Sequence, residues 1–131
     1  MKRDMDLIRL SLLKIEEEYS STAIYDLQID GYDMETIAYH CKLLKEAEFI
    51  SDYAAEYGDG EICSFGVSSL TWEGHEYLEK IRDNSTWKKV KDTISQKGLP
   101  LAIETIKTVS TALITAATDA VVKSIMSNAG L

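Results

Sequence analysis

The chain has few of the residues that interrupt or redirect a fold. Its 131 residues include one proline and two histidines, whereas 45% of the residues are apolar. This composition is that of an ordered polypeptide, and the length suits one compact domain with an appendage. No internal repeat or low-complexity segment is visible. The chain is therefore expected to fold around one main core.

Cysteine is nearly absent. Cys41 and Cys63 are the two that occur, and the charged start Met-Lys-Arg-Asp-Met-Asp is not that of a signal peptide. Both features predict a reduced, cytoplasmic protein, and a disulfide between the two cysteines is the less favoured alternative.

Catalytic and metal-binding motifs are also lacking. There is no Gly-x-Ser-x-Gly, no phosphate-binding loop and no acid pair at a recognisable spacing, so we expect neither enzyme activity nor a cofactor. His40, Cys41, Cys63 and His75 supply four nitrogen or sulfur ligands, but no two of them have a chelating spacing. Packing roles are expected for these residues instead of a zinc site.

Long hydrophobic runs are missing. The longest charge-free run of the tail, 108–118, has 11 residues, five of them with hydroxyl side chains. A membrane-spanning helix needs about 20 mostly apolar residues, so the sequence predicts no membrane association.

Positive charge is scarce in the first two thirds. Residues 1–84 hold 8 Lys and Arg against 19 Asp and Glu, which gives −11, while residues 85–131 hold 6 against 3, which gives +3. An acidic body repels nucleic acid and attracts cationic surfaces.

Apolar spacing predicts the elements. Helices are expected at 4–18, from 34 with Asp33 as N-cap, at 72–82, at 87–96 capped by Ser85 or Thr86, and at 101–126. Strands are expected at 24–29 and 49–53, with a return strand through 62–65 after the Gly-Asp-Gly at 58–60. The residues expected to be buried in the helix at 72–82 are Trp72, Tyr77, Leu78 and Ile81.

Two segments carry a family resemblance. Tyr-His-Cys-Lys-Leu-Leu-Lys-Glu-Ala at 39–47, followed by Phe-Ile at 49–50, resembles the recognition helix and next strand of winged-helix regulators. With the opening residues 1–9, Leu-Thr-Trp-Glu-Gly-His-Glu-Tyr-Leu at 70–78 and Trp87, the chain resembles an uncharacterised bacterial and prophage family, domain-of-unknown-function family 2513. The resemblance implies a winged-helix fold and a home on mobile elements, and it implies no activity.

The expected fold is α+β and mostly α. Residues 1–83 form a winged-helix domain of three helices, a short strand and a two-stranded wing, and 84–131 form a C-terminal helical extension. Two departures from a DNA reader are visible. A strand replaces the first helix of the helix-turn-helix pair, and Glu48 stands where such regulators commonly have glycine.

The acidic charge predicts a protein partner over DNA. The recognition-like helix and its approach carry a net −2, and residues 52–61 add four acids and no cation. Phosphate neutralisation drives most non-specific DNA affinity, so duplex binding is expected to be poor. The residues expected to meet a basic protein partner are Glu46, Asp52, Asp59 and Glu61.

The last helix is expected to join copies of the chain into a homo-oligomer. It is apolar around much of its circumference, and such a helix must bury itself. The expected seam consists of Ile106, Val109, Leu113, Ala117, Val121 and Ile125. The alternative is that the helix folds back across the winged-helix core.

The alternative function is a dimeric transcriptional regulator. In that reading Lys88, Lys89 and Lys91 contact the DNA backbone while the dimer presents two recognition helices to a palindromic site. The other interpretation of the same lysines is a solvated helix face.

Overall fold

Helices predominate in the computed structural model, which describes residues 1–128 and is of the α+β class. The elements in order are α1 (Met5–Glu18), β1 (Ile24–Tyr25), α2 (Met34–Glu46), β2 (Tyr53–Gly58), β3 (Glu61–Val67), α3 (Trp72–Ile81), α4 (Asn84–Gln96) and α5 (Ile103–Asn128). They form two compact units, Met1–Glu79 (the first unit) and Lys80–Leu131 (the second unit), so the boundary falls inside α3.

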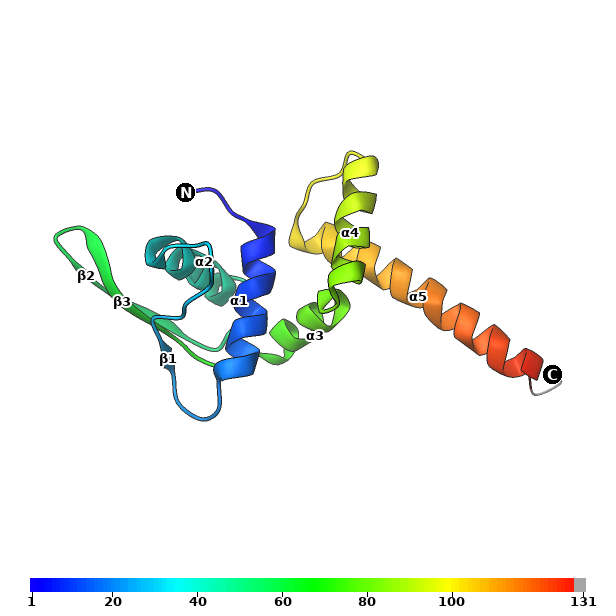
Figure 1. Cartoon of the computed structure of the whole chain (residues 1–131), viewed down its shortest axis with the longest axis horizontal. Coiled ribbons are helices and arrows are strands. Elements are labelled where there is room, and N and C mark those ends of the chain that lie inside the picture. Colours follow the sequence, from blue (N-terminus) through cyan, green and yellow to red (C-terminus); the bar gives the residue numbers. More distant parts are fainter. Residues whose placement is uncertain (129–131) are drawn as a thin grey trace. The chain divides into compact units, whose positions relative to one another are not determined.

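The first unit contains an antiparallel sheet with strand order β1-β3-β2. Val67 of β3 pairs with Ile24 on one side and with Tyr53 on the other. Asp59 and Gly60 both have positive φ, 53° and 80°, as a tight Asp-Gly hairpin turn requires. The predicted hairpin is confirmed, and it extends beyond the helices of this unit (Figure 1).

Two strand predictions were wrong in their bounds. The strand expected at 24–29 ends at Tyr25, because Asp26 turns the backbone to a φ of 53°. There its carboxylate accepts hydrogen bonds from Ser64 Oγ and from the Phe65 amide, both at 3.0 Å. The strand expected at 49–53 begins instead at Tyr53, and Ile50 makes only an isolated bridge with Leu70.

Side-chain caps set the starts of α1 and α2, and the Asp33 cap of α2 confirms the prediction, whereas Asp4, expected inside the first helix, caps it instead. Asp4 accepts hydrogen bonds from the amides of Asp6 and Leu7, and Asp33 accepts one from the amide of Thr36. The apolar stripes that follow fill the core of this unit. Its fully buried members include Leu7, Leu12, Ile15, Ile37 and Leu44.

The second unit is a helical hairpin. α4 begins at Asn84 with Asp83 as its N-cap, earlier than the start at residue 87 that was expected. It ends at Gln96, and Gly98 after its C-cap Lys97 takes the left-handed φ of 65° that suits glycine; α5 then packs against α4. α5 has 26 residues and α4 has 13, so α5 continues past the end of its partner (Figure 1).

Candidate interaction surfaces

The four acids expected to bind a partner are all exposed, but they lie in two places. Glu46 ends α2 and Asp52 precedes β2, whereas Asp59 and Glu61 lie at the hairpin tip. A strand advances about 3.3 Å per residue, so the hairpin separates these pairs by about 20 Å. The four acids therefore do not form one cluster: two lie toward the base of the hairpin, where Lys45 Nζ donates to the Ser51 carbonyl at 3.2 Å, and two lie at its tip.

A longer stretch around these acids is without positive charge. Residues 46–79 contain nine Asp and Glu residues and no Lys or Arg. The stretch runs from the end of α2 through the hairpin and into α3. Its Asp and Glu residues are not offset by any Lys or Arg of the same stretch, which favours a cationic partner over phosphate.

The turn after α2, residues 47–49, closes that helix and leads toward the hairpin. The Phe49 amide bonds to the Leu44 carbonyl and the Glu48 amide to that of Lys45, the pattern of a Schellman C-cap. Glu48 is the left-handed residue of this cap, with a φ of 63°, where glycine is the usual choice. The departure at Glu48 seen in the sequence is thus a strained backbone position.

Thr71 and Gly74 fasten the start of α3 to the same turn. The Thr71 amide donates to the Phe49 carbonyl at 2.9 Å, and Thr71 Oγ1 donates to the Glu48 carbonyl at 2.5 Å. A Cβ on Gly74 would lie 2.1 Å from the Phe49 carbonyl oxygen, so only glycine allows this contact. The Leu-Thr-Trp-Glu-Gly-His motif therefore packs the start of α3 against the turn that ends α2.

Trp72 was expected to be buried, and that prediction was wrong, because its side chain is 77% exposed. The buried face of α3 consists of Gly74, Tyr77, Leu78 and Ile81, at helical spacing. Trp72 precedes Gly74 by two residues and points about 160° away from it around the helix. The backbone contact at Gly74 thus turns Trp72 toward solvent.

His40 is completely buried and structural. Its Nε2 accepts a hydrogen bond from the Asp4 amide and its Nδ1 donates to the Thr36 carbonyl, both at 2.8 Å, which defines the neutral Nδ1–H tautomer. It therefore joins the start of α1 to α2.

The other candidate ligands are dispersed. Cys41 is buried, which raises the pKa of its thiol to about 12, whereas Cys63 is exposed on β3. His75 is exposed on α3, with its Nδ1 3.6 Å from a Glu16 carboxylate oxygen. Within residues 1–128, no three His, Cys, Asp or Glu side chains gather closely enough to hold a metal ion.

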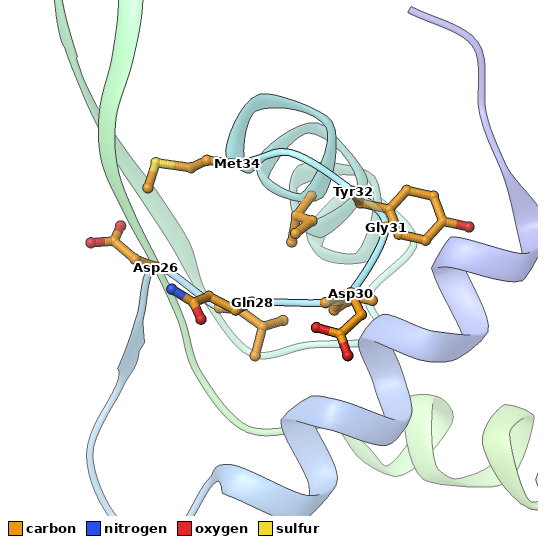
Figure 2. Close-up of a pocket in the computed structure, with 9 residues that line it drawn as sticks. Asp26, Gln28, Asp30, Gly31, Tyr32 and Met34 are labelled. Carbon is orange, nitrogen blue, oxygen red and sulfur yellow. The ribbon is translucent and has the colours of Figure 1, made fainter.

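A cavity of about 340 Å³ lies between the loop after β1 and the start of α2 (Figure 2). Asp26, Gln28, Asp30 and Tyr32 give it a polar lining, and Met34 and Ile37 are among its apolar residues. The Tyr32 hydroxyl is 3.4 Å from Asp4 Oδ2, and burial together with this carboxylate raises the tyrosine pKa.

The polar lining of this cavity disfavours an anionic group. It includes two carboxylates and no cation, and it has no nucleophile beside a base. Sequence reasoning found only the turn at Asp30-Gly31 in this loop and missed the hollow that the turn encloses.

The residues expected to bind DNA or a second copy lie in the second unit. Lys88 and Lys89 are exposed on α4, and Lys91 is half-buried with its Nζ 5.4 Å from the centre of the Trp87 ring. In α5, Ile106 is fully buried, Val109 and Leu113 are half-buried, and Ala117, Val121 and Ile125 are exposed. The exposed part of the expected seam thus begins after Leu113.

Helix α5 is long and apolar enough to cross a membrane by length and composition. Its best 18-residue window has a mean hydropathy of 1.3 and is 6% buried. The expectation that no segment associates with a membrane therefore stays a prediction.

Comparison with known proteins places most of the chain in one family. The family model DUF2513, described as a hypothetical protein, matches residues 2–100. The chain belongs to this family. An "Uncharacterized protein" of Haemophilus influenzae is 40% identical over 115 residues, which cover 87% of this chain and 96% of the relative. No solved structure gives a significant match. The family match ends before α5 begins at Ile103.

Proposed function

We propose that this chain is a non-enzymatic protein-interaction module that self-associates through the second half of α5. Its first unit is a winged-helix domain that offers an acidic surface to a basic protein. The observation that carries the proposal is the exposure of residues 114–128, which include several large apolar side chains and none that is buried. Apolar surface of this extent is typical of an interface.

The winged-helix assignment rests on element order. α1, β1, α2, the β2–β3 hairpin and α3 follow one another as in that fold, and β1 pairs with the second hairpin strand. One part is absent from the described chain, because residues 26–33 between β1 and α2 contain no helix. A helix-turn-helix pair would place its first helix there, which weakens the case for DNA reading.

The apolar stripe of α5 favours a second copy as its partner. Ile106, Ser110, Leu113, Ala117 and Val121 follow at spacings of three or four residues, so the buried stripe of the first half continues into the exposed second half. Ser110, at 0% exposure, satisfies its hydroxyl by donating to the Ile106 carbonyl at 2.6 Å. The apolar stripe that is buried in the first half of α5 therefore continues, exposed, along its second half.

The charges of this half favour helix pairing over a lipid environment. Asp119 and Lys123 lie two residues to either side of Val121, which places each about 160° from it around the helix. In a helix pair centred on Val121 both charges face water. In a bilayer the same two charges would lie in hydrocarbon, which is unfavourable by about 3 kcal/mol each.

The alternative function, a dimeric DNA-binding regulator, is favoured by one observation. Lys88 and Lys89 are consecutive exposed residues of α4, about 100° apart around the helix and outside the acidic stretch. A duplex held there would be bound through its phosphates, with α2 contributing little to sequence reading because its exposed side chains include Glu35 and Glu46.

Fluorescence anisotropy of labelled duplexes, random and from the region upstream of the coding sequence, separates the two functions. The interaction module predicts weak binding that disappears by physiological salt. Tight binding that prefers the upstream duplex, and that falls when Lys88, Lys89 and Lys91 are changed to Glu, would overturn the proposal in favour of the regulator.

The cytoplasmic, mobile-element setting is part of the same proposal. It rests on the low cysteine content and on the family resemblance. Sequencing of the neighbouring genes tests the mobile-element setting, because a locus without phage or transposon genes would contradict that setting.

A further inference from the structure

Trp72 has the largest exposed fraction among the large apolar side chains of residues 1–128, at 77%. It is the first residue of α3, and the helix is fixed there by the contact between Gly74 and the Phe49 carbonyl. The indole is therefore displayed from a rigid backbone. Tryptophan, with tyrosine and arginine, is enriched among the residues that contribute most to binding in protein interfaces.

Two exposed carboxylates lie on one side of this indole around α3, Glu76 about 40° and Glu73 about 100° from Trp72. Glu73 follows it directly and Glu76 lies one turn further on the same side of α3, and both are exposed. Glu48, also exposed, belongs to the turn whose carbonyl accepts the hydrogen bond from Thr71, the residue before Trp72. Neither Glu73 nor Glu76 takes part in an ion pair within the described part of the chain.

We propose that the face formed by Trp72, Glu73 and Glu76 binds an arginine side chain of the protein partner. This inference rests on the proposed function, because it names the anchor for the basic partner. The guanidinium group stacks on the indole face while its N–H groups donate to the neighbouring carboxylates.

Other occupants fit this chemistry less well. An apolar side chain would cover the indole but would remove water from Glu73 and Glu76 without pairing their charges. A lysine pairs with one carboxylate at a time and lacks the planar group that stacks on indole. Duplex DNA would bring phosphates against the same carboxylates.

The test is a calorimetric titration of the full chain with a synthetic peptide of five arginines separated by glycines, and with its lysine counterpart. Arginine peptide should bind more tightly than lysine peptide. Trp72→Ala should weaken the arginine peptide about 5-fold or more, and Trp72→Phe, which keeps a ring, about 2-fold. Glu73→Gln with Glu76→Gln should weaken it further and reduce its salt dependence.

Tyr57→Ala is the matched control. Tyr57 is an exposed aromatic residue on β2, at 65%, with Glu56 beside it. This variant should bind the arginine peptide as the unaltered chain does. Thermal unfolding by circular dichroism should show that Trp72→Ala remains folded, because the side chain it removes is mostly in solvent.

Two results would overturn the inference in different ways. If Trp72→Ala binds the peptide unchanged while Asp52→Asn, Asp59→Asn and Glu61→Gln together abolish binding, the acidic surface binds the partner without Trp72 and the proposed function survives. If the unaltered chain binds neither peptide even at low salt, both this inference and the basic partner of the proposed function are wrong.

Discussion

The first unit covers its apolar side chains far more completely than the second unit covers those of α5. In the first unit the exposed large apolar residues are scattered singly over different elements, as in most folded domains. In the second unit five of them, Ile114, Val121, Val122, Ile125 and Met126, lie within 13 residues of one helix. The cause is length, because α4 is half as long as α5.

The two units also differ in charge. Residues 1–79 hold 6 Lys and Arg against 18 Asp and Glu, which gives −12, while residues 80–131 hold 8 against 4, which gives +4. An acidic unit with a closed core and a mildly basic unit with an uncovered helix suit different partners. The first suits a cationic protein, and the second suits another copy of itself.

The largest expected effect on the free energy of unfolding comes from Gly74 of the first unit, which lies against the Phe49 carbonyl. Gly74→Ala would put a methyl group 2.1 Å from a backbone oxygen, so α3 must move. The free energy of unfolding should fall by about 3 kcal/mol or more. Urea unfolding followed by circular dichroism measures it. Glu73→Ala, one residue away and exposed, should change it by less than about 0.5 kcal/mol, and equal effects would contradict the close contact.

The next largest effect on the free energy of unfolding is expected to differ between the buried and the exposed half of α5. Ile106→Ala leaves a cavity at a fully buried position and should lower the free energy of unfolding by about 3 kcal/mol. Ile125→Ala, at a position 62% exposed, should leave the unfolding of the dilute chain unchanged. Equal destabilisation by Ile125→Ala and Ile106→Ala at low protein concentration would show that the second half of α5 is not solvent-exposed in the single chain.

A smaller effect contrasts the two histidines. His40→Leu removes two hydrogen bonds and leaves the Asp4 amide without its acceptor, which should destabilise the chain by about 2 kcal/mol. His75→Leu should be nearly neutral, because that ring is half in solvent. Chemical denaturation of both variants measures the difference, and a neutral His40→Leu would remove the structural role assigned to His40.

The smallest effect contrasts the same helix cap in the two units. Residue 48 and residue 98 both take a left-handed φ, 63° and 65°, but the first is glutamate and the second is glycine. Glu48→Gly should raise the free energy of unfolding by about 1 kcal/mol, and Gly98→Ala should lower it by about as much. Thermal melts measure both, and a destabilising Glu48→Gly would show that the glutamate side chain outweighs the strain.

Local sequence signals predicted most elements and missed what depends on contacts between elements. Helical periodicity and the Asp33 cap located α2, and the Asp-Gly turn located the hairpin. The strand at 24–29 was predicted too long, because alternation alone cannot show that Asp26 turns back to Ser64 and Phe65. Trp72 was wrongly predicted to be buried. Local periodicity cannot show the contact between Gly74 and Phe49, 25 positions apart in the sequence, that turns Trp72 toward solvent.

The candidate sites were predictable to a similar degree. The acids and the seam of α5 follow from residue types alone. The division of that seam after Leu113 depends on how far α4 reaches, and the cavity beside α2 depends on the path of a loop without regular structure.

Sedimentation velocity over a wide range of protein concentration tests self-association through α5 most directly. Self-association through the apolar stripe of α5 predicts a monomer–oligomer equilibrium that Val121→Ser with Ile125→Ser abolishes. Val122→Ser with Met126→Ser, shifted by one residue around the same helix, should leave the equilibrium largely intact. A chain that stays monomeric at every concentration and instead floats with phosphatidylcholine vesicles, or two double variants that behave alike, would contradict it.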